Sequence, residues 1–225
     1  MGRRLLILPA VAVALLLAGC GGSSSNGEAE KSASQILADA KRAAIEAGSV
    51  KVRGTIEDQG TAIALDLLVG TDGGSGTMTI QGSKIDIIRI GNVVYLRAGA
   101  DFYRQVGAGK GAGQLLDGRW LKVASTSADF KDLASFTDID QFMKNALKPE
   151  GKISKGGETT VSGSKAIELK DSKGGSLFVA TTGKPYPVEF HGGGTTSGKL
   201  VLTDFGAAVK PKAPKNPVDL AKLGG

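Results

Sequence analysis

The chain has 225 residues, a formal net charge of +6, one cysteine and one histidine. This length suits about one folded domain, and the aromatic residues (5%) are too few and too dispersed for the stacking surface of a nucleic-acid-binding protein. A single cysteine excludes an internal disulfide. Because metal sites need several converging histidine, cysteine or carboxylate ligands, we expect neither a metal nor another cofactor.

Residues 1–19 have the pattern of a signal peptide. Arg3 and Arg4 supply a positive start, and residues 5–18 form an apolar stretch that is interrupted only by Pro9. That stretch is shorter than the roughly 20 residues that a helix needs to cross a bilayer. A charged start, a short apolar segment and small residues at its end therefore predict a signal peptide rather than a membrane span.

The sequence Leu17-Ala18-Gly19-Cys20 resembles the lipobox of bacterial lipoproteins. The resemblance implies that signal peptidase cuts between Gly19 and Cys20, and that the sulfur of Cys20 carries a diacylglycerol. Cys20 is thus the predicted lipidation site, and the chain is expected to be exported and anchored through this lipid to the outer face of the cytoplasmic membrane. The alternative is an ordinary buried cysteine in a plain signal peptide.

Residues 20–30 are predicted to hold the lipidated cysteine and a flexible tether. The stretch "GGSSSNG", residues 21–27, has no side chain capable of building a core. Residues 28–48 have the spacing of an amphipathic helix, with Ser32 or Ser34 as its cap and Gly48 as its end. The apolar face of this helix comprises Ile36, Leu37, Ala40, Ala44 and Ile45.

From Ser49 onward, apolar residues alternate with polar ones, which is the period of a half-buried strand. Strand-length runs separated by Gly, Asn or Asp predict about seven strands before the next helical segment. The last two are residues 101–106 ("DFYRQV") and a run after residue 118 ("RWLKVAS"), and the glycine-rich residues 107–113 predict a flexible loop between them. These short connections indicate an antiparallel meander.

Residues 128–147 lose the alternation and recover a helical spacing. Asp138 and Asp140 would lie at a helix start, where carboxylates are favourable, and Pro149 would end the segment. About four or five further strands follow. Residues 207–225 are rich in lysine and proline, and we predict that they are poorly ordered. The folded domain is therefore assigned to residues 31–206, in the α+β class.

One strand-length run, residues 61–70, suggests an internal surface. Its odd positions are uniformly apolar, and they should point inward because a strand sends alternate side chains to opposite faces. The following run offers the same kind of inward pair. The predicted wall of an apolar cavity comprises Ile63, Leu65, Leu67, Val69, Met78 and Ile80. A close-packed core built from the same residues is an equal alternative.

Several segments together resemble the LppX/LprG type of mycobacterial lipoprotein, a group similar in fold to the LolA and LolB carriers. They are residues 119–123 ("RWLKV"), 156–170 ("GGETTVSGSKAIELK"), 177–190 ("LFVATTGKPYPVEF") and 198–206 ("GKLVLTDFG"). The resemblance implies an incomplete antiparallel β-barrel, or half-barrel, with helices covering its concave face. It also implies an apolar cavity, which in characterised members encloses the acyl chains of glycolipids or phospholipids.

The sequence lacks common signatures of catalysis. His191 stands beside a run of glycines and is interpreted as a solvated turn residue, and no G-x-S-x-G elbow accompanies it. No Gly-Lys pair is followed by Ser or Thr, so a P-loop is absent. We therefore expect a non-enzymatic, monomeric lipoprotein that binds or transfers lipid or glycolipid. The alternative is a non-catalytic envelope scaffold or adhesion module with a filled core.

Overall fold

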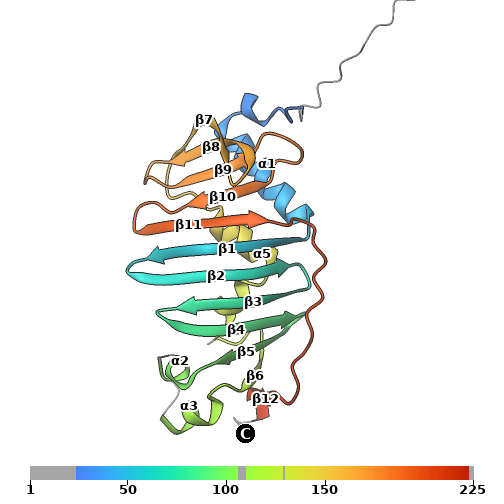
Figure 1. Ribbon diagram of the computed structural model, residues 1–225, viewed down its shortest axis with the longest axis vertical. Helices are drawn as coiled ribbons and strands as arrows, with labels where there is room; N and C mark the ends of the chain where they lie inside the picture. Colours follow the sequence, from blue (N-terminus) through green and yellow to red (C-terminus); the bar gives the residue numbers. More distant parts are fainter. Residues whose placement is uncertain (1–23, 106–109, 129, 223–225) are drawn as a thin grey trace, which may run out of the picture.

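The computed structural model describes residues 24–105, 110–128 and 130–222. This part of the chain forms one long, open sheet with helices packed on one of its faces (Figure 1). Gly19 and Cys20 lie outside the described residues, so cleavage and lipidation there stay predictions.

The sheet has twelve strands in the order β12-β6-β5-β4-β3-β2-β1-β11-β10-β9-β8-β7. Strands β1 to β6 form the predicted meander, each pairing antiparallel with the next. Strand β11 then returns to pair with β1 along most of its length, which joins the strands β7 to β11 to the meander. The described sheet ends at β12 and β7 without closing, and this confirms the predicted incomplete half-barrel of the α+β class.

The strands have the following bounds: β1 Ser49–Asp58, β2 Thr61–Gly70, β3 Gly73–Ile80, β4 Ser83–Ile90, β5 Val93–Ala98, β6 Trp120–Ala124, β7 Ile153–Val161, β8 Ser164–Asp171, β9 Ser176–Ala180, β10 Pro187–His191, β11 Thr196–Thr203 and β12 Val218–Asp219. The helices are α1 Ala33–Glu46, α2 Ala100–Gln105, α3 Lys110–Leu116, α4 Lys131–Ser135 and α5 Ile139–Ala146, with short 3-10 turns η1 Glu28–Glu30 and η2 Leu220–Lys222.

Helices α1 and α5 cover the concave face of the sheet (Figure 1). The side chain of Ser32 accepts a hydrogen bond from the backbone N–H of Gln35, so Ser32 is the cap of α1, as one of the two predictions had it. Asp138 caps α5 in the same way through the N–H of Gln141. These local signals place the helix starts, and the apolar faces of both helices then pack on the sheet.

Two glycines within strands let the sheet bend around the helices. Gly54 in β1 and Gly76 in β3 have φ values of 144° and 154°, which residues with side chains rarely adopt. A side chain at either position would overlap the backbone of the neighbouring strand. Glycine inside a strand is typical of a tight bend or a close approach of two backbones.

The main hydrophobic core lies on the concave face. One row of inward-facing residues crosses neighbouring strands from Val52 through Leu67 and Ile87 to Leu96, and all of these are fully buried. Burying each such side chain contributes about 1.5–3 kcal/mol to folding. The described part of the chain thus owes its stability to this core.

Two local predictions near residue 100 are wrong. The segment predicted as a strand over residues 101–106 begins with helix α2, in which the adjacent Phe102 and Tyr103 are both buried, with ring centres 5.5 Å apart. A strand would send these neighbours to opposite faces, whereas a helical turn lets both reach the core. Residues 110–113, predicted as part of a flexible loop, belong to helix α3.

The predicted helical insert, residues 128–147, is divided into α4 and α5. The break lies at Thr137, whose hydroxyl donates a hydrogen bond to the carbonyl of Ala134 (2.7 Å). A threonine that bonds back to the preceding turn competes with the helix ladder. The insert therefore crosses the concave face as two short helices.

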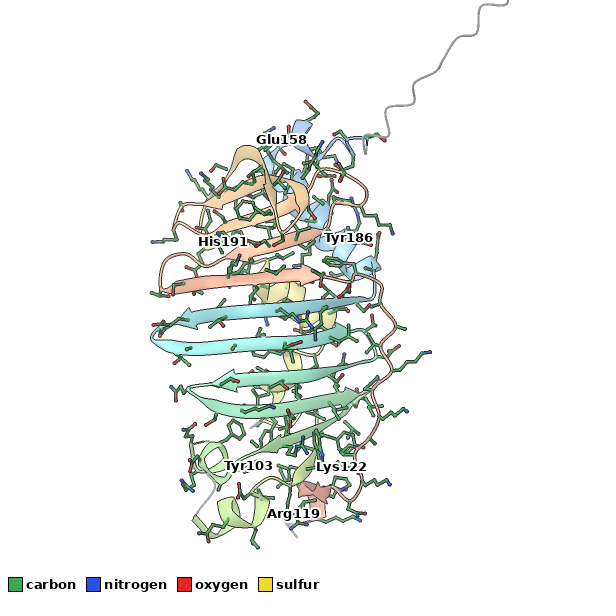
Figure 2. All side chains as sticks on the ribbon, in the orientation of Figure 1. Tyr103, Arg119, Lys122, Glu158, Tyr186 and His191 are labelled. Atoms are coloured by element: carbon green, nitrogen blue, oxygen red, sulfur yellow. The ribbon has the colours of Figure 1, made fainter. Side chains whose placement is uncertain are left out.

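The lysine- and proline-rich tail has a defined path, so the prediction of poor order is wrong for residues 207–222. This segment runs along the strand ends and adds β12 beside β6 (Figure 1). Lys122 Nζ donates to the carboxylate of Asp219 (2.9 Å; Figure 2). Gly73 leaves room for the segment, because a Cβ there would lie 2.9 Å from Pro211. The predicted end of the folded domain is therefore too early.

The tether is shorter than predicted. Asn26 Nδ2 donates to the carbonyl of Ala180 (3.0 Å), and Ser25 forms a β-bridge with Thr182. From Ser25 onward, the chain is fixed to the connection between β9 and β10. The predicted domain start at residue 31 is therefore too late.

Candidate functional site

A cavity of about 320 Å³ lies between the concave face of the sheet and the insert formed by α4 and α5. Its apolar wall comprises Ile56, Ile63, Leu65, Phe136, Phe142, Ala146, Phe190 and Leu200. Its rim comprises Asp58, Ser135, Asn145, Lys148, Glu150, Asp171, Gly193 and Thr196. An apolar wall with a few polar groups is typical of small-molecule sites, whose volumes range over about 300–1,000 Å³.

The register of three strands builds the floor of this cavity. Ile56 of β1 is the cross-strand partner of Ile63 of β2. In the next inward-facing row, Gly54 of β1 stands between Leu65 of β2 and Leu200 of β11. Because Gly54 has no side chain, β1 places nothing between these two leucines.

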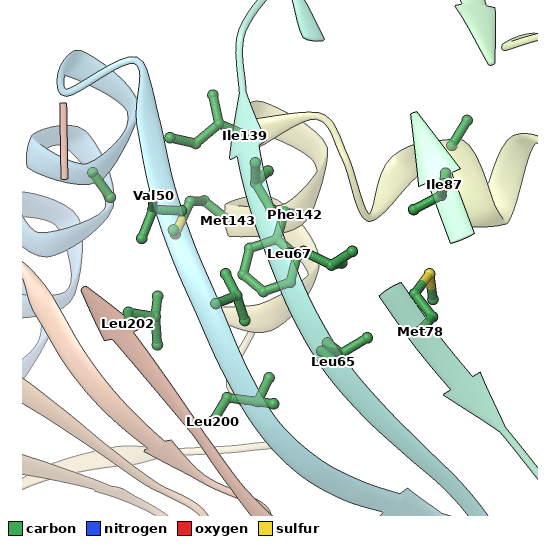
Figure 3. Close-up of a cluster of buried hydrophobic side chains, with 14 of the residues drawn as sticks. Val50, Leu65, Leu67, Met78, Ile87, Ile139, Phe142, Met143, Leu200 and Leu202 are labelled. Carbon is green, nitrogen blue, oxygen red and sulfur yellow. The ribbon is translucent and has the colours of Figure 1, made fainter. Parts of the chain in front are cut away.

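The structure divides the predicted cavity wall into two parts. The residues named on β2 all face inward, and Ile63 and Leu65 border the cavity. Leu67, Val69 and Met78 are fully buried in the core, in one cluster with residues of α5 (Figure 3). Ile80 is half-buried and packs against that core. A ligand-binding role for any of these residues stays a prediction.

The cavity wall also contains residues that the sequence analysis had not assigned to it. Ile56, Phe190 and Leu200 come from β1, β10 and β11, and these strands meet through pairings between distant parts of the chain. Alternation within each strand could have placed these side chains on the inner face. Nothing local to any one strand indicates which strands are neighbours.

The charged residues of the rim are mostly acidic. Asp58 accepts a hydrogen bond from the hydroxyl of Thr196 (3.1 Å), and Asp171 accepts from the backbone N–H groups of Lys173 (2.8 Å) and Gly175 (3.0 Å). Burial raises the pKa of Asp171, but these backbone hydrogen bonds lower it by more, so its pKa lies below the usual range. The rim can therefore present carboxylate charge and hydrogen-bond acceptors to a bound molecule.

Arg89 holds the insert against the sheet. Its buried guanidinium donates hydrogen bonds to the carbonyls of Gly70 (2.6 Å), Thr71 (2.9 Å) and Thr137 (3.0 Å). Burial lowers the pKa of Arg89, and the carboxylate of Asp138, 3.4 Å away, opposes that shift. The turn between α4 and α5 is thus fixed to the strand ends at the side where the core is filled.

A second, much smaller void lies beside the cavity. It has a volume of about 40 Å³, and it is lined by Leu37 of α1 and by Ile153 and Leu169 of the sheet. It shares Ala146 and Phe190 with the main cavity. The apolar space therefore extends slightly past the end of α5.

His191 is not in the predicted turn, although its side chain is partly solvated as predicted. It lies on β10, edge-on to Phe178, and its Nε2 is 2.6 Å from Oε1 of the buried Glu189 (Figure 2). Ser162 Oγ donates to Oε2 of the same carboxylate (2.6 Å). Burial raises the pKa of Glu189, but the hydrogen bonds from Ser162 and His191 lower it by more, so its pKa lies below the usual range. Both partners contact the carboxylate, which makes this a stabilising cluster.

Within the described ranges, no group of histidine, cysteine, aspartate and glutamate residues is arranged to hold a metal ion. Of the described helices, none is both long and apolar enough to cross a membrane. No family model and no curated protein sequence matches the chain.

One solved structure with a similar arrangement supports the fold, and two others are more distantly similar. LprF from Mycobacterium bovis matches with a TM-score of 0.52 at 12% identity, over 85% of this chain and 99% of LprF. An uncharacterised conserved protein from Thermus thermophilus matches with a TM-score of 0.42 at 10% identity, over 84% of this chain and 98% of that one. MucB matches with a TM-score of 0.37 at 17% identity, over 81% and 62%. The predicted resemblance to the LppX/LprG type of lipoprotein is confirmed at the level of the fold by LprF.

Proposed function

We propose that the protein is a membrane-anchored lipoprotein of the cell envelope whose cavity binds a lipid or glycolipid through an acyl chain. The observation that carries this proposal is the apolar cavity between the sheet and the insert, beside a well-filled hydrophobic core. Transfer of an alkyl chain from water into such a cavity is favourable by about 0.8 kcal/mol for each buried methylene group. The half-barrel fold shared with LprF and the resemblance of the sequence segments support the same function.

Anchoring would occur through Cys20, which precedes the described residues by a few positions. Attached acyl chains contribute about 0.8 kcal/mol per buried methylene group, which is enough for stable anchoring when two or three chains are present. We expect Cys20→Ala to move the protein from the membrane fraction to the soluble fraction. A variant that stays in the membrane and resists high salt would show that residues 1–19 form an uncleaved anchor instead.

Leu65→Trp tests the cavity directly, because the added ring would occupy the space proposed for the acyl chain. We expect it to abolish binding of the neutral apolar dye N-phenylnaphthylamine to the purified protein and to reduce lipid found in organic extracts. The thermal midpoint should change little, whereas the same enlargement in a filled core costs about 1–3 kcal/mol.

Leu68→Trp is the matched control, since Leu68 lies on the same strand and faces outward. It should leave both dye binding and extracted lipid unchanged. If the parent protein binds no dye, yields no lipid, and loses stability on Leu65→Trp, the scaffold or adhesion module with a filled core is the better description.

A further inference from the structure

The volume of the cavity limits how much of a lipid it can hold. A methylene group fills about as much space as a water molecule, about 30 Å³, so a cavity of about 320 Å³ takes about ten methylene groups. The adjoining void of about 40 Å³ adds little. One chain of a membrane lipid spans about half of a hydrocarbon core that is about 30 Å thick, which already needs this much room. A second chain of the same length would exceed this volume.

The position of the polar residues fixes the direction of such a chain. Asp58 ends β1, Gly193 lies in the connection between β10 and β11, and Thr196 begins β11, on one side of the sheet (Figure 1). Glu150 follows α5 on the way to β7. The apolar wall lies between these residues and the filled core. A bound chain would therefore point its end toward Phe142 and its head group toward the rim.

The rim carries an excess of negative charge. Of the described charged residues that line the cavity, Asp58, Glu150 and Asp171 are acidic and Lys148 is basic. The ion pairs of the described residues lie elsewhere in the molecule. The backbone N–H groups that lower the pKa of Asp171 keep its carboxylate ionised at neutral pH. An anionic head group at this rim would be repelled, and a cationic one would be attracted.

We infer that the cavity accommodates a single alkyl chain and selects lipids whose head group has no net negative charge. This inference rests on the proposed function and narrows its ligand class: a monoacylglycerol or a cationic single-chain lipid fits, and a diacyl or anionic lipid does not. The volume of the cavity and the charge of its rim both support this one class of ligand.

The experiment is displacement of N-phenylnaphthylamine from the full chain by ligands of one chain length. Monolauroylglycerol and dilauroylglycerol differ in the number of chains, and dodecylamine and dodecanoate differ in charge, all used below the concentration at which they form micelles. We expect monolauroylglycerol and dodecylamine to displace the dye and dilauroylglycerol to fail. Dodecanoate should need about five-fold more ligand than dodecylamine at low salt, and this ratio should shrink in high salt.

Two double variants test whether the charge preference comes from the rim. The double variant Asp58→Asn with Glu150→Gln should bring the affinity for dodecanoate close to that for dodecylamine. The control is Glu46→Gln with Glu158→Gln, which changes the net charge equally at exposed positions outside the rim and should leave the ratio unchanged. If both double variants lower the ratio equally, the selectivity comes from net charge and its assignment to the rim is overturned.

The outcomes separate this inference from the proposed function. Equal displacement by monolauroylglycerol and dilauroylglycerol would overturn the single-chain limit while leaving lipid binding intact. Displacement by dodecanoate at or below the dodecylamine concentration would overturn the charge selectivity alone. If the dye does not bind to the parent protein, the proposed function itself fails.

Discussion

The two ends of strand β2 carry the same kind of side chain and have different surroundings. Leu67 and Val69 are fully buried in the core, whereas Ile63 and Leu65, on the same face, border the cavity. Alternation in the sequence treats all of these residues alike. What distinguishes the two ends is therefore the structure that covers them.

The cover comes from the insert. Ile139 and Met143 of α5 are fully buried in one cluster with Leu67, and Figure 3 shows them beside it on the concave side of β2. Near Ile63, the insert contributes Phe136 and the end of α5, and the cavity lies between these residues and β2. One face of a strand can thus serve as core at one end and as cavity at the other.

Arg89→Met should have the largest effect on stability. It removes the group that fixes the insert over the buried end of β2, where Leu67 and Val69 lie. The buried carbonyls of Gly70 and Thr137 and the carbonyl of the exposed Thr71 would lose the hydrogen bonds from Arg89. We expect the free energy of unfolding to fall by about 3 kcal/mol or more, measured by urea denaturation.

The control for this variant is Arg97→Met on the outer face of β5. Arg97 pairs with Asp86 (2.6 Å) and lies over the ring of Trp120, and its side chain is 46% exposed. An exposed ion pair contributes about 1 kcal/mol or less. Equal losses in the two variants would show that Arg89 does not hold the insert in the way its hydrogen bonds indicate.

Leu67→Ala and Leu65→Ala compare the two ends directly. At Leu67 the truncation opens a new hole in a filled core, and we expect a loss of about 2–5 kcal/mol in unfolding free energy. At Leu65 the removed atoms already lack neighbours on one side, so the loss should be about half as large. The measurement is urea unfolding of both variants, and a loss at Leu65 equal to that at Leu67 would mean that the cavity is filled in solution.

The local features of this fold could be predicted from the sequence because they depend on neighbouring residues. Alternation placed the inward faces of β1 and β2, and Ser32 and Asp138 marked the starts of two helices. A run such as "DFYRQV" was misread because a short amphipathic helix and a short strand share similar composition. There, the burial of two adjacent aromatic rings decided in favour of the helix.

The rest depends on contacts between distant parts of the chain. The cavity exists because β1 pairs with β11, about 150 residues later, which no local pattern indicates. The tail takes a defined path because β6 offers an edge to β12 and Gly73 leaves room beside Pro211. Composition alone describes such a segment as disordered.

Glu189→Gln should have the smallest effect on stability. It tests the strands that border the cavity. Glu189 precedes Phe190 of the cavity wall, and on the outer face it accepts a hydrogen bond from Ser162 in the connection between β7 and β8, which anchors β10. The folded-state pKa of Glu189 is lowered, so its contribution to stability is present above the unfolded-state pKa and is lost as the pH falls through the folded-state value. The variant should therefore be less stable than the parent at neutral pH, and this difference should vanish in acid, once Glu189 is protonated in both the folded and the unfolded state.

Unfolding free energies at both pH values measure this difference, and hydrogen exchange locates it. Amides of β10 should exchange faster in the variant at neutral pH, while those around Leu67 in β2 stay protected, because local opening is confined to the element that loses its contacts. Glu158→Gln, at an exposed position on β7, is the control and should change neither. A stability difference for Glu189→Gln that stays constant across pH would mean that the charged form of this carboxylate does not stabilise β10. The position of β10 beside the cavity would then be stabilised by the packing of Phe190 and its neighbours alone.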